Sequence, residues 1–243
     1  MLSDMLSHWD QYGEEYELFQ QDVHILIKGT LDAALKYLDS NGSQNLTSIE
    51  RMMENAQGDY HEHLIDEHMD VQGQNASQET FLRNMALVAL TSRLTHSLRK
   101  MARVAETFSP RKKRYGNSRM SEFARLWSEY WERFQIKANA AQIAFVDALR
   151  EVRNQIVHEG GEANTLKPIS ELDPYGDAAG ILDLSFSKKY PQYVCGEGMG
   201  AEVSVSEALL EENIEAAINL VGWLAAELRR NELASIQNTS GVQ

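Results

Sequence analysis

The residues best suited to chemistry lie together at positions 153–158, where the sequence reads Arg-Asn-Gln-Ile-Val-His. An arginine holds a phosphate or carboxylate through a forked pair of hydrogen bonds, and a histidine exchanges a proton near neutral pH. Asn154 and His158 are four residues apart, so they are neighbours on a helix. These residue types and spacings are typical of a site that binds an anion and moves a proton.

A helix from about Ala138 to His158 is expected to position these residues, and Gly160 and Gly161 are expected to end it. At about 100° per residue, Arg153, Asn154 and His158 fall opposite an apolar stripe, and Arg150 lies between them. The stripe consists of Ala141, Ala144, Phe145, Ala148, Leu149, Val152 and Ile156. The spacing alone favours a merely solvated polar face, but the helix end at His158 and the two glycines that follow favour a site.

The rest of the chain predicts a mainly α fold, because apolar residues recur at helical spacing through most of it. Ser40–Ser43 is expected to end the helix Glu14–Leu38. Ser77 and Thr80 are expected to cap the start of the helix Gln78–Phe108, and Pro110 is expected to end that helix. The expected helices are Glu14–Leu38, a less regular Leu46–Gln72, Gln78–Phe108, an aromatic Met120–Phe134, and Ser206–Arg230. The expected core face of Gln78–Phe108 is Phe81, Met85, Val88, Ala89, Ser92, Thr95 and Leu98.

A small β-hairpin is expected near 181–205, because Ile181–Phe186 and Ala201–Val205 alternate apolar and polar residues. The polar tail 235–243 is expected to be loose. No linker is visible, so residues 1–243 are interpreted as one mainly helical domain.

Composition places the chain among folded proteins, with 43% hydrophobic and 24% charged residues. No apolar run is long enough for a membrane helix, and the acidic N-terminus does not resemble a secretory signal. The single cysteine, Cys195, excludes an internal disulfide framework and fits a reducing compartment. We therefore expect a cytoplasmic protein without a membrane partner.

Charge is unevenly distributed along the sequence. The net charge is −13, yet residues 99–119 contain eight lysines or arginines and one glutamate, a local charge of +7 against −20 for the remainder. The overall charge argues against indiscriminate coating of nucleic acid, whereas the basic segment is compatible with one surface for an anion. A solvated helix end and loop would give the same pattern.

Residues 153–158 resemble the Arg-x4–6-His motif of HEPN domains (higher eukaryotes and prokaryotes nucleotide-binding), where a polar residue such as Asn often follows the arginine. The order of elements is also similar over residues 78–230, with Phe81–Arg103 and Phe123–Phe134 before the motif helix and Ser206–Arg230 after it. The resemblance implies an up-and-down helical bundle. Residues 1–76 would be an N-terminal helical extension.

The resemblance further implies metal-independent cleavage of RNA by a homodimer, in which two motif helices meet near a two-fold axis. Arg153 would hold the phosphate, Asn154 would orient His158 or a phosphate oxygen, and His158 would transfer protons. The product would be a 2′,3′-cyclic phosphate, and neither a metal nor a cofactor is expected. Further contacts to the RNA backbone are expected from basic residues, namely Arg111, Lys112, Lys113, Arg114 and Arg150. Many members of the family act in toxin–antitoxin systems or phage defence, which implies an inhibitor or antitoxin as a partner.

One position departs from a subgroup of HEPN toxins. In that subgroup a tyrosine, modified by a partner nucleotidyltransferase, stands two residues after the histidine, where this chain has Gly160.

Two other functions stay open. The chain is compatible with a non-catalytic module that binds RNA, a nucleotide or a partner protein. A weaker alternative is a metal-dependent hydrolase that uses the His and acidic residues between His61 and His68.

Overall fold

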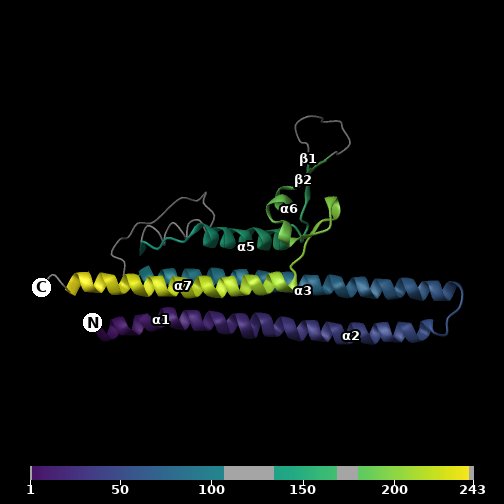
Figure 1. Cartoon of the computed structure of the whole chain (residues 1–243), viewed down its shortest axis with the longest axis horizontal. Coiled ribbons are helices and arrows are strands. Elements are labelled where there is room, and N and C mark those ends of the chain that lie inside the picture. Colours follow the sequence, from purple (N-terminus) through teal and green to yellow (C-terminus); the bar gives the residue numbers. More distant parts are fainter. Residues whose placement is uncertain (1, 107–133, 169–179, 241–243) are drawn as a thin grey trace. The chain divides into compact units, whose positions relative to one another are not determined.

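The computed structural model describes residues 2–106, 134–168 and 180–240 (Figure 1). Its long helices are α1 (Leu2–Gln21), a π-helical segment η1 (Asp22–Lys28), α2 (Gly29–Met53), α3 (Asp59–Glu106), α5 (Ala140–His158) and α7 (Glu207–Ser240). The shorter elements are β1 (Thr165–Pro168), β2 (Gly180–Asp183), α6 (Ser185–Lys189), η2 (Pro191–Tyr193), β3 (Val194–Cys195), η3 (Gly198–Gly200) and β4 (Glu202–Val203). The predicted mainly α fold with a small β insertion is confirmed.

The chain divides into two compact units, each assembled from separated segments. Unit 1 consists of Met1–His24, Ala89–Asn154 and Glu211–Gln243, and unit 2 consists of Ile25–Val88 and Gln155–Leu210. The boundary passes within α3 and within α5, so each of these helices contributes to both units. The expectation of a single domain stays a prediction.

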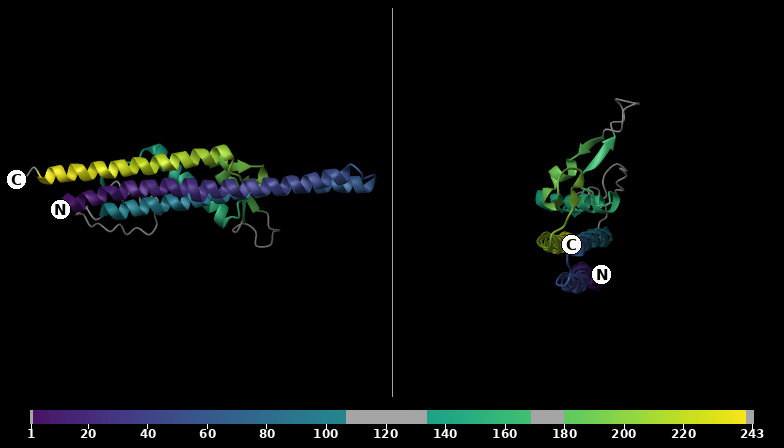
Figure 2. Two further views of the ribbon diagram at one scale, coloured as in Figure 1. Left: turned by 90° about the horizontal axis from the view of Figure 1, so that it is seen from below. Right: turned by 90° about the vertical axis from the view of Figure 1, so that its right-hand side faces the viewer.

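Unit 1 contains three long helices that run side by side, namely α1, the second half of α3, and α7 (Figure 2). Its core is apolar and includes Phe19 of α1, Leu94 of α3, Leu149 of α5 and Leu224 of α7, all fully buried. The Tyr12 hydroxyl donates to Glu232 Oε1 at 2.7 Å, which links α1 to α7. A Cβ atom on Gly222 would lie 3.0 Å from the Tyr16 ring, so the glycine permits close approach of α7 to α1.

A buried ion cluster fixes α3 against α1 in unit 1. Glu15 is 2% exposed, and its Oε1 accepts hydrogen bonds from Arg93 at 2.8 Å and from Ser97 at 2.7 Å. The Lys100 ammonium lies 2.5 Å from the other carboxylate oxygen. Arg93 also contacts Asp22 at 2.5 Å. Burial by itself raises the pKa of Glu15, but the hydrogen bonds from Lys100, Arg93 and Ser97 together outweigh burial and lower it.

Unit 2 contains an antiparallel pair formed by α2 and the first half of α3, which Figure 1 shows joined by a short turn. Gly58 in that turn has φ +61°, a left-handed conformation that glycine adopts without strain. Gly42 is buried in α2, and a Cβ atom there would lie 2.3 Å from Nδ2 of Asn75 on α3. His68 of α3 lies 3.6 Å from Glu50 of α2.

The helix boundaries predicted within residues 40–80 are wrong, because they depend on tertiary packing that the local sequence does not reveal. Gly42 does not stop a helix, because it lies where α2 and α3 approach each other and a side chain would clash. The break falls instead at 54–58, inside the expected helix Leu46–Gln72. Ser77 and Thr80 cap nothing, because α3 passes through them. A helix-compatible polar sequence does not reveal such breaks unless its tertiary partner is known.

The core face predicted for α3 is also wrong. Phe81 is 63% exposed and Met85 is 43% exposed, whereas Leu87, Leu90, Leu94 and Leu98 are buried. Only Leu98 belongs to both sets. The sequence pattern is broad enough to fit two neighbouring faces, and packing in the two units selects the leucine face.

The β insertion in unit 2 has a different pairing from the one expected. β2 pairs with β1, and β4 pairs with β3, both antiparallel, so 181–186 and 201–205 are not partners. Ser185–Lys189 is the short helix α6. Asn84 of α3 fixes β4 and the segment just after it, because its Nδ2 donates to the Val203 carbonyl at 2.8 Å and its Oδ1 accepts from the Val205 N–H at 3.1 Å.

The last helix begins as predicted but ends later. The Ser206 hydroxyl accepts from the Leu209 N–H at 3.2 Å, which is an N-cap, and α7 then continues to Ser240. The expectation of a loose tail is therefore wrong for 235–240. Within the described residues, no helix is both long and apolar enough to cross a lipid bilayer.

Candidate anion site on helix α5

The motif residues stand on a well-delimited helix. Asn139 and Gln142 cap its start reciprocally, because each side-chain oxygen accepts from the other residue's backbone N–H at 2.9 Å. At the other end, the Gly161 N–H donates to the Gln155 carbonyl at 3.1 Å. Gly160 and Gly161 have φ +64° and +88°, values that favour glycine. The predicted helix and its glycine stop are confirmed.

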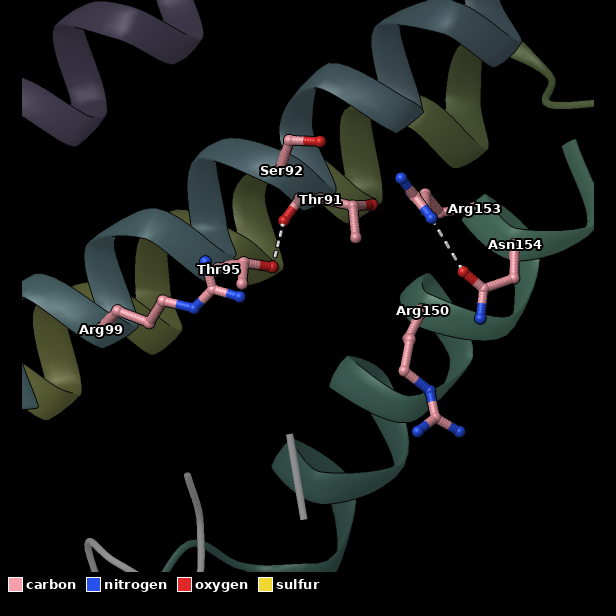
Figure 3. A pocket seen from close by; sticks show the side chains of 7 residues that line it. All are labelled: Thr91, Ser92, Thr95, Arg99, Arg150, Arg153 and Asn154. Atoms are coloured by element: carbon pink, nitrogen blue, oxygen red, sulfur yellow. Dashed lines mark hydrogen bonds between the residues drawn. The ribbon is translucent and has the colours of Figure 1, made fainter. Parts of the chain in front are cut away.

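A polar cavity of about 380 Å³ lies between α5 and α3 in unit 1 (Figure 3). Helix α3 lines it with Thr91, Ser92, Thr95 and Arg99, and α5 lines it with Arg150, Arg153 and Asn154. The described lining therefore contains three guanidinium groups and three hydroxyl groups, without a carboxylate or an aromatic ring. Such a lining is suited to an anion with several oxygen atoms, a phosphate group above all.

Two of the lining residues are linked directly. Arg153 donates from Nη1 to Asn154 Oδ1 at 3.0 Å. In Figure 3 the Arg153 side chain reaches toward Thr91 and Ser92, while Arg99 extends along α3 toward Thr95. Asn154 thus orients the Arg153 guanidinium within the structure of the single chain. A role for Asn154 in orienting His158 stays a prediction.

Arg150 differs from the other two arginines in its surroundings. Its guanidinium contacts the adjacent Glu151 carboxylate, and in Figure 3 it is turned away from Thr95. Its Nε atom is buried without a hydrogen-bond partner. Arg150 lines the cavity, and Glu151 offsets part of its charge. Its predicted contact with RNA stays a prediction.

The buried face of α5 is rotated from the predicted stripe. Val146, Leu149 and Val152 are buried, whereas Ala141 and Ala144 are exposed. This rotation brings Arg153 to the edge of the buried face, where it is half-buried, rather than to the opposite side. The reason is that small alanines lose little by remaining in solvent, whereas larger apolar side chains gain more from burial.

His158 is the last residue of α5 and is exposed. It follows Arg153 by five residues on the same helix, but it belongs to unit 2, whereas the cavity belongs to unit 1. Arg153 and Asn154 therefore line a common cavity, and His158 is not among the described lining residues.

The remaining predicted RNA contacts, Arg111, Lys112, Lys113 and Arg114, lie outside the described residues, as does nearly all of the expected aromatic helix 120–134. The sequence did not single out Thr91, Ser92, Thr95 or Arg99 as site residues. Ser92 and Thr95 were assigned to a core face, and Arg99 was counted only as part of a basic segment. Their polar spacing at 92, 95 and 99 was the available signal, because it marks one hydrophilic stripe on α3.

The residues between His61 and His68 do not form a metal site in the structure. Within the described part of the chain, no group of three or more His, Cys, Asp or Glu residues is arranged to hold a metal ion.

Comparisons with known proteins provide no second line of evidence for the site, since no protein-family model, no curated protein and no solved structure matches this chain.

Proposed function

We propose that this chain is a metal-independent endoribonuclease of the HEPN type. The observation that carries the proposal is the cavity in which Arg153 and Asn154 of the motif converge with Arg99 and Arg150. A concave site with several arginines and no described carboxylate in its lining provides the electrostatic stabilisation that phosphoryl transfer requires. His158, on the same helix, supplies an imidazole that can accept and donate a proton.

The proposed reaction is an internal transesterification of RNA. The ribose 2′-oxygen attacks the adjacent phosphorus, the bond from phosphorus to the 5′-oxygen breaks, and a 2′,3′-cyclic phosphate forms. His158 accepts the proton of the 2′-hydroxyl, and the His158 of a second copy donates a proton to the departing 5′-oxygen. Arg153, held by Asn154, neutralises the charge that builds on the phosphate oxygens.

This scheme requires a homodimer through α5, in which two exposed His158 side chains approach across a two-fold axis. The assembly is itself part of the proposal. Sedimentation equilibrium of the purified chain would measure it, and a chain that is monomeric at the concentrations of the cleavage assay would contradict the two-histidine scheme. A role in a toxin–antitoxin or defence system, with an inhibitor as partner, belongs to the same proposal.

The test is cleavage of labelled single-stranded RNA in the presence of EDTA. We expect the wild-type chain to cleave, and His158→Ala and Arg153→Ala each to lower the rate by about 100-fold or more. His63→Ala is the matched control, because His63 is exposed on α3 in unit 2. Its replacement is expected to leave the rate unchanged. Full activity of His158→Ala, or loss of wild-type activity in EDTA, would contradict the proposal.

A non-catalytic RNA-binding module is the second candidate. The observation that favours it is that the described lining of the cavity contains three arginines and does not include His158. This candidate predicts that the wild-type chain binds RNA and leaves it intact, and that Arg153→Ala weakens binding while His158→Ala does not.

A further inference from the structure

The cavity of unit 1 has a feature that the motif does not explain. Four of its seven described lining residues come from α3, where Ser92, Thr95 and Arg99 stand at positions i, i+3 and i+7 and therefore share one stripe. Arg99 extends along this stripe toward Thr95, and Arg153 reaches toward the stripe from α5 (Figure 3). An anion in the cavity would therefore be approached by guanidinium groups from two different helices.

The chemistry of the lining also limits what part of a nucleic acid it can recognise. None of its described residues is aromatic, so these residues offer a base no ring on which to stack. Its single amide side chain, Asn154, already accepts a hydrogen bond from Arg153. The Thr95 hydroxyl donates to the Thr91 carbonyl at 2.8 Å, which leaves its oxygen to accept from a group such as a ribose hydroxyl. Arginines and hydroxyls of this kind contact phosphate and sugar.

We infer that Arg99 is a further phosphate-binding residue, and that the cavity between α3 and α5 recognises the sugar–phosphate backbone of single-stranded RNA independently of base identity. A cavity of about 380 Å³ is on the scale of a single nucleotide and is too small for a duplex. The inference rests on the proposed function in taking RNA as the ligand. It extends that function to a residue on another helix and to a substrate class.

The test measures binding separately from cleavage. The full chain carrying His158→Ala keeps the RNA intact, and its affinity for short labelled oligo(A), oligo(U) and oligo(C) is measured by fluorescence anisotropy over a range of salt concentrations. Arg99→Ala is then added to this background. Arg230→Ala is the matched control, because Arg230 lies on α7 of the same unit, has a 70% exposed side chain, and is not among the cavity residues.

We expect Arg99→Ala to weaken binding about five- to tenfold for all three oligomers, and to lower the slope of log affinity against log salt by about 0.7, the value for one single-strand phosphate contact. Arg230→Ala is expected to change each affinity less than twofold. If Arg99→Ala does not fold, as judged by circular dichroism, Arg99→Gln replaces it with the same expectation.

Three results would overturn the inference. The first is an Arg99 effect no larger than that of Arg230→Ala. The second is an effect confined to one oligomer, which would indicate base recognition. The third is the absence of binding to any oligomer by the His158→Ala parent. Failure of the ribonuclease proposal would look different, since RNA would then bind in an Arg99-dependent manner while the wild-type chain leaves it uncut.

Discussion

Replacing Glu15 with glutamine should destabilise unit 1, because the carboxylate is buried and neutralises cations of α3. The change keeps one oxygen that can accept from Arg93 and Ser97, but it places an NH2 group or a neutral oxygen near the Lys100 ammonium. Removing one partner of a buried ion pair costs about 3–5 kcal/mol. Two features reduce this cost. Arg93 keeps its contact with Asp22, and the Lys100 side chain is 47% exposed, so solvent stabilises its charge. We therefore expect a loss of about 2–3 kcal/mol at neutral pH.

Thermal unfolding followed by circular dichroism measures this loss. For a chain of this size, 1 kcal/mol corresponds to about 2–4 °C in Tm, so the expected decrease is about 4–12 °C. Glu17→Gln is the matched control, because Glu17 is exposed on the same helix and its replacement should change Tm by no more than about 1–2 °C.

The pH dependence provides a second, independent readout. The pKa of Glu15 is lower in the folded chain than its ordinary value of 4.5, because the hydrogen bonds from Lys100, Arg93 and Ser97 outweigh burial. The unfolded chain therefore binds a proton at Glu15 before the folded chain does. The stabilisation from Glu15 is complete above the unfolded pKa and is lost as pH falls through the folded pKa. The difference in Tm between wild type and Glu15→Gln should accordingly shrink below about pH 4.5. Equal stability of the two proteins at pH 7, or a difference that grows on acidification, would refute the reasoning.

Other contacts lead to further predictions. Asn84→Ala removes both hydrogen bonds that fix the region of β4, so it should cost about 2–3 kcal/mol and speed amide hydrogen exchange at Val205, whose N–H donates to Asn84; unchanged exchange there would contradict the structure. Gly42→Leu should destabilise the α2–α3 pair by about 1–3 kcal/mol in urea unfolding, because its side chain meets Asn75, and Asn75→Ala should restore part of the loss. Gly73→Ala, on an open part of α3, should instead stabilise by about 0.5–1 kcal/mol.

The motif helix could be predicted from the sequence because its signals are local. Capping by Asn139 and Gln142, apolar spacing, and a double glycine all act within a few residues. The predicted start of the last helix at Ser206 is confirmed for the same reason. The prediction that a helix ends at Ser40–Ser43 was wrong because Gly42 lies where α2 packs against Asn75 of α3. Residue spacing along one segment cannot reveal such a packing contact.

Only the part of the cavity lining that belongs to α5 could be predicted from the sequence. Arg150, Arg153 and Asn154 were singled out from the sequence, whereas the contribution of α3 depends on which face of that helix meets α5. Ser92 and Thr95 are small enough to fit a core stripe, so their position in an apolar pattern concealed their place in the cavity lining. The rotated buried face of α5 has the same origin, since alanines count as apolar in a pattern but gain little from burial.

Helix α3 carries two separate groups of polar residues, and the basic residues in the two groups differ in what surrounds them. Residues 93, 97 and 100 lie on one side of the helix, roughly 130° from the stripe formed by 92, 95 and 99 at about 100° per residue. Arg93 and Lys100 contact Glu15, and Arg93 also contacts Asp22, so these two cations serve the folding of unit 1. Arg99 instead lines a cavity whose described residues include no carboxylate. The basic segment that begins at Arg99 is therefore not one uniform anion surface. Neutralising Glu15 and removing Arg99 should have separable effects, the first on stability and the second on RNA affinity.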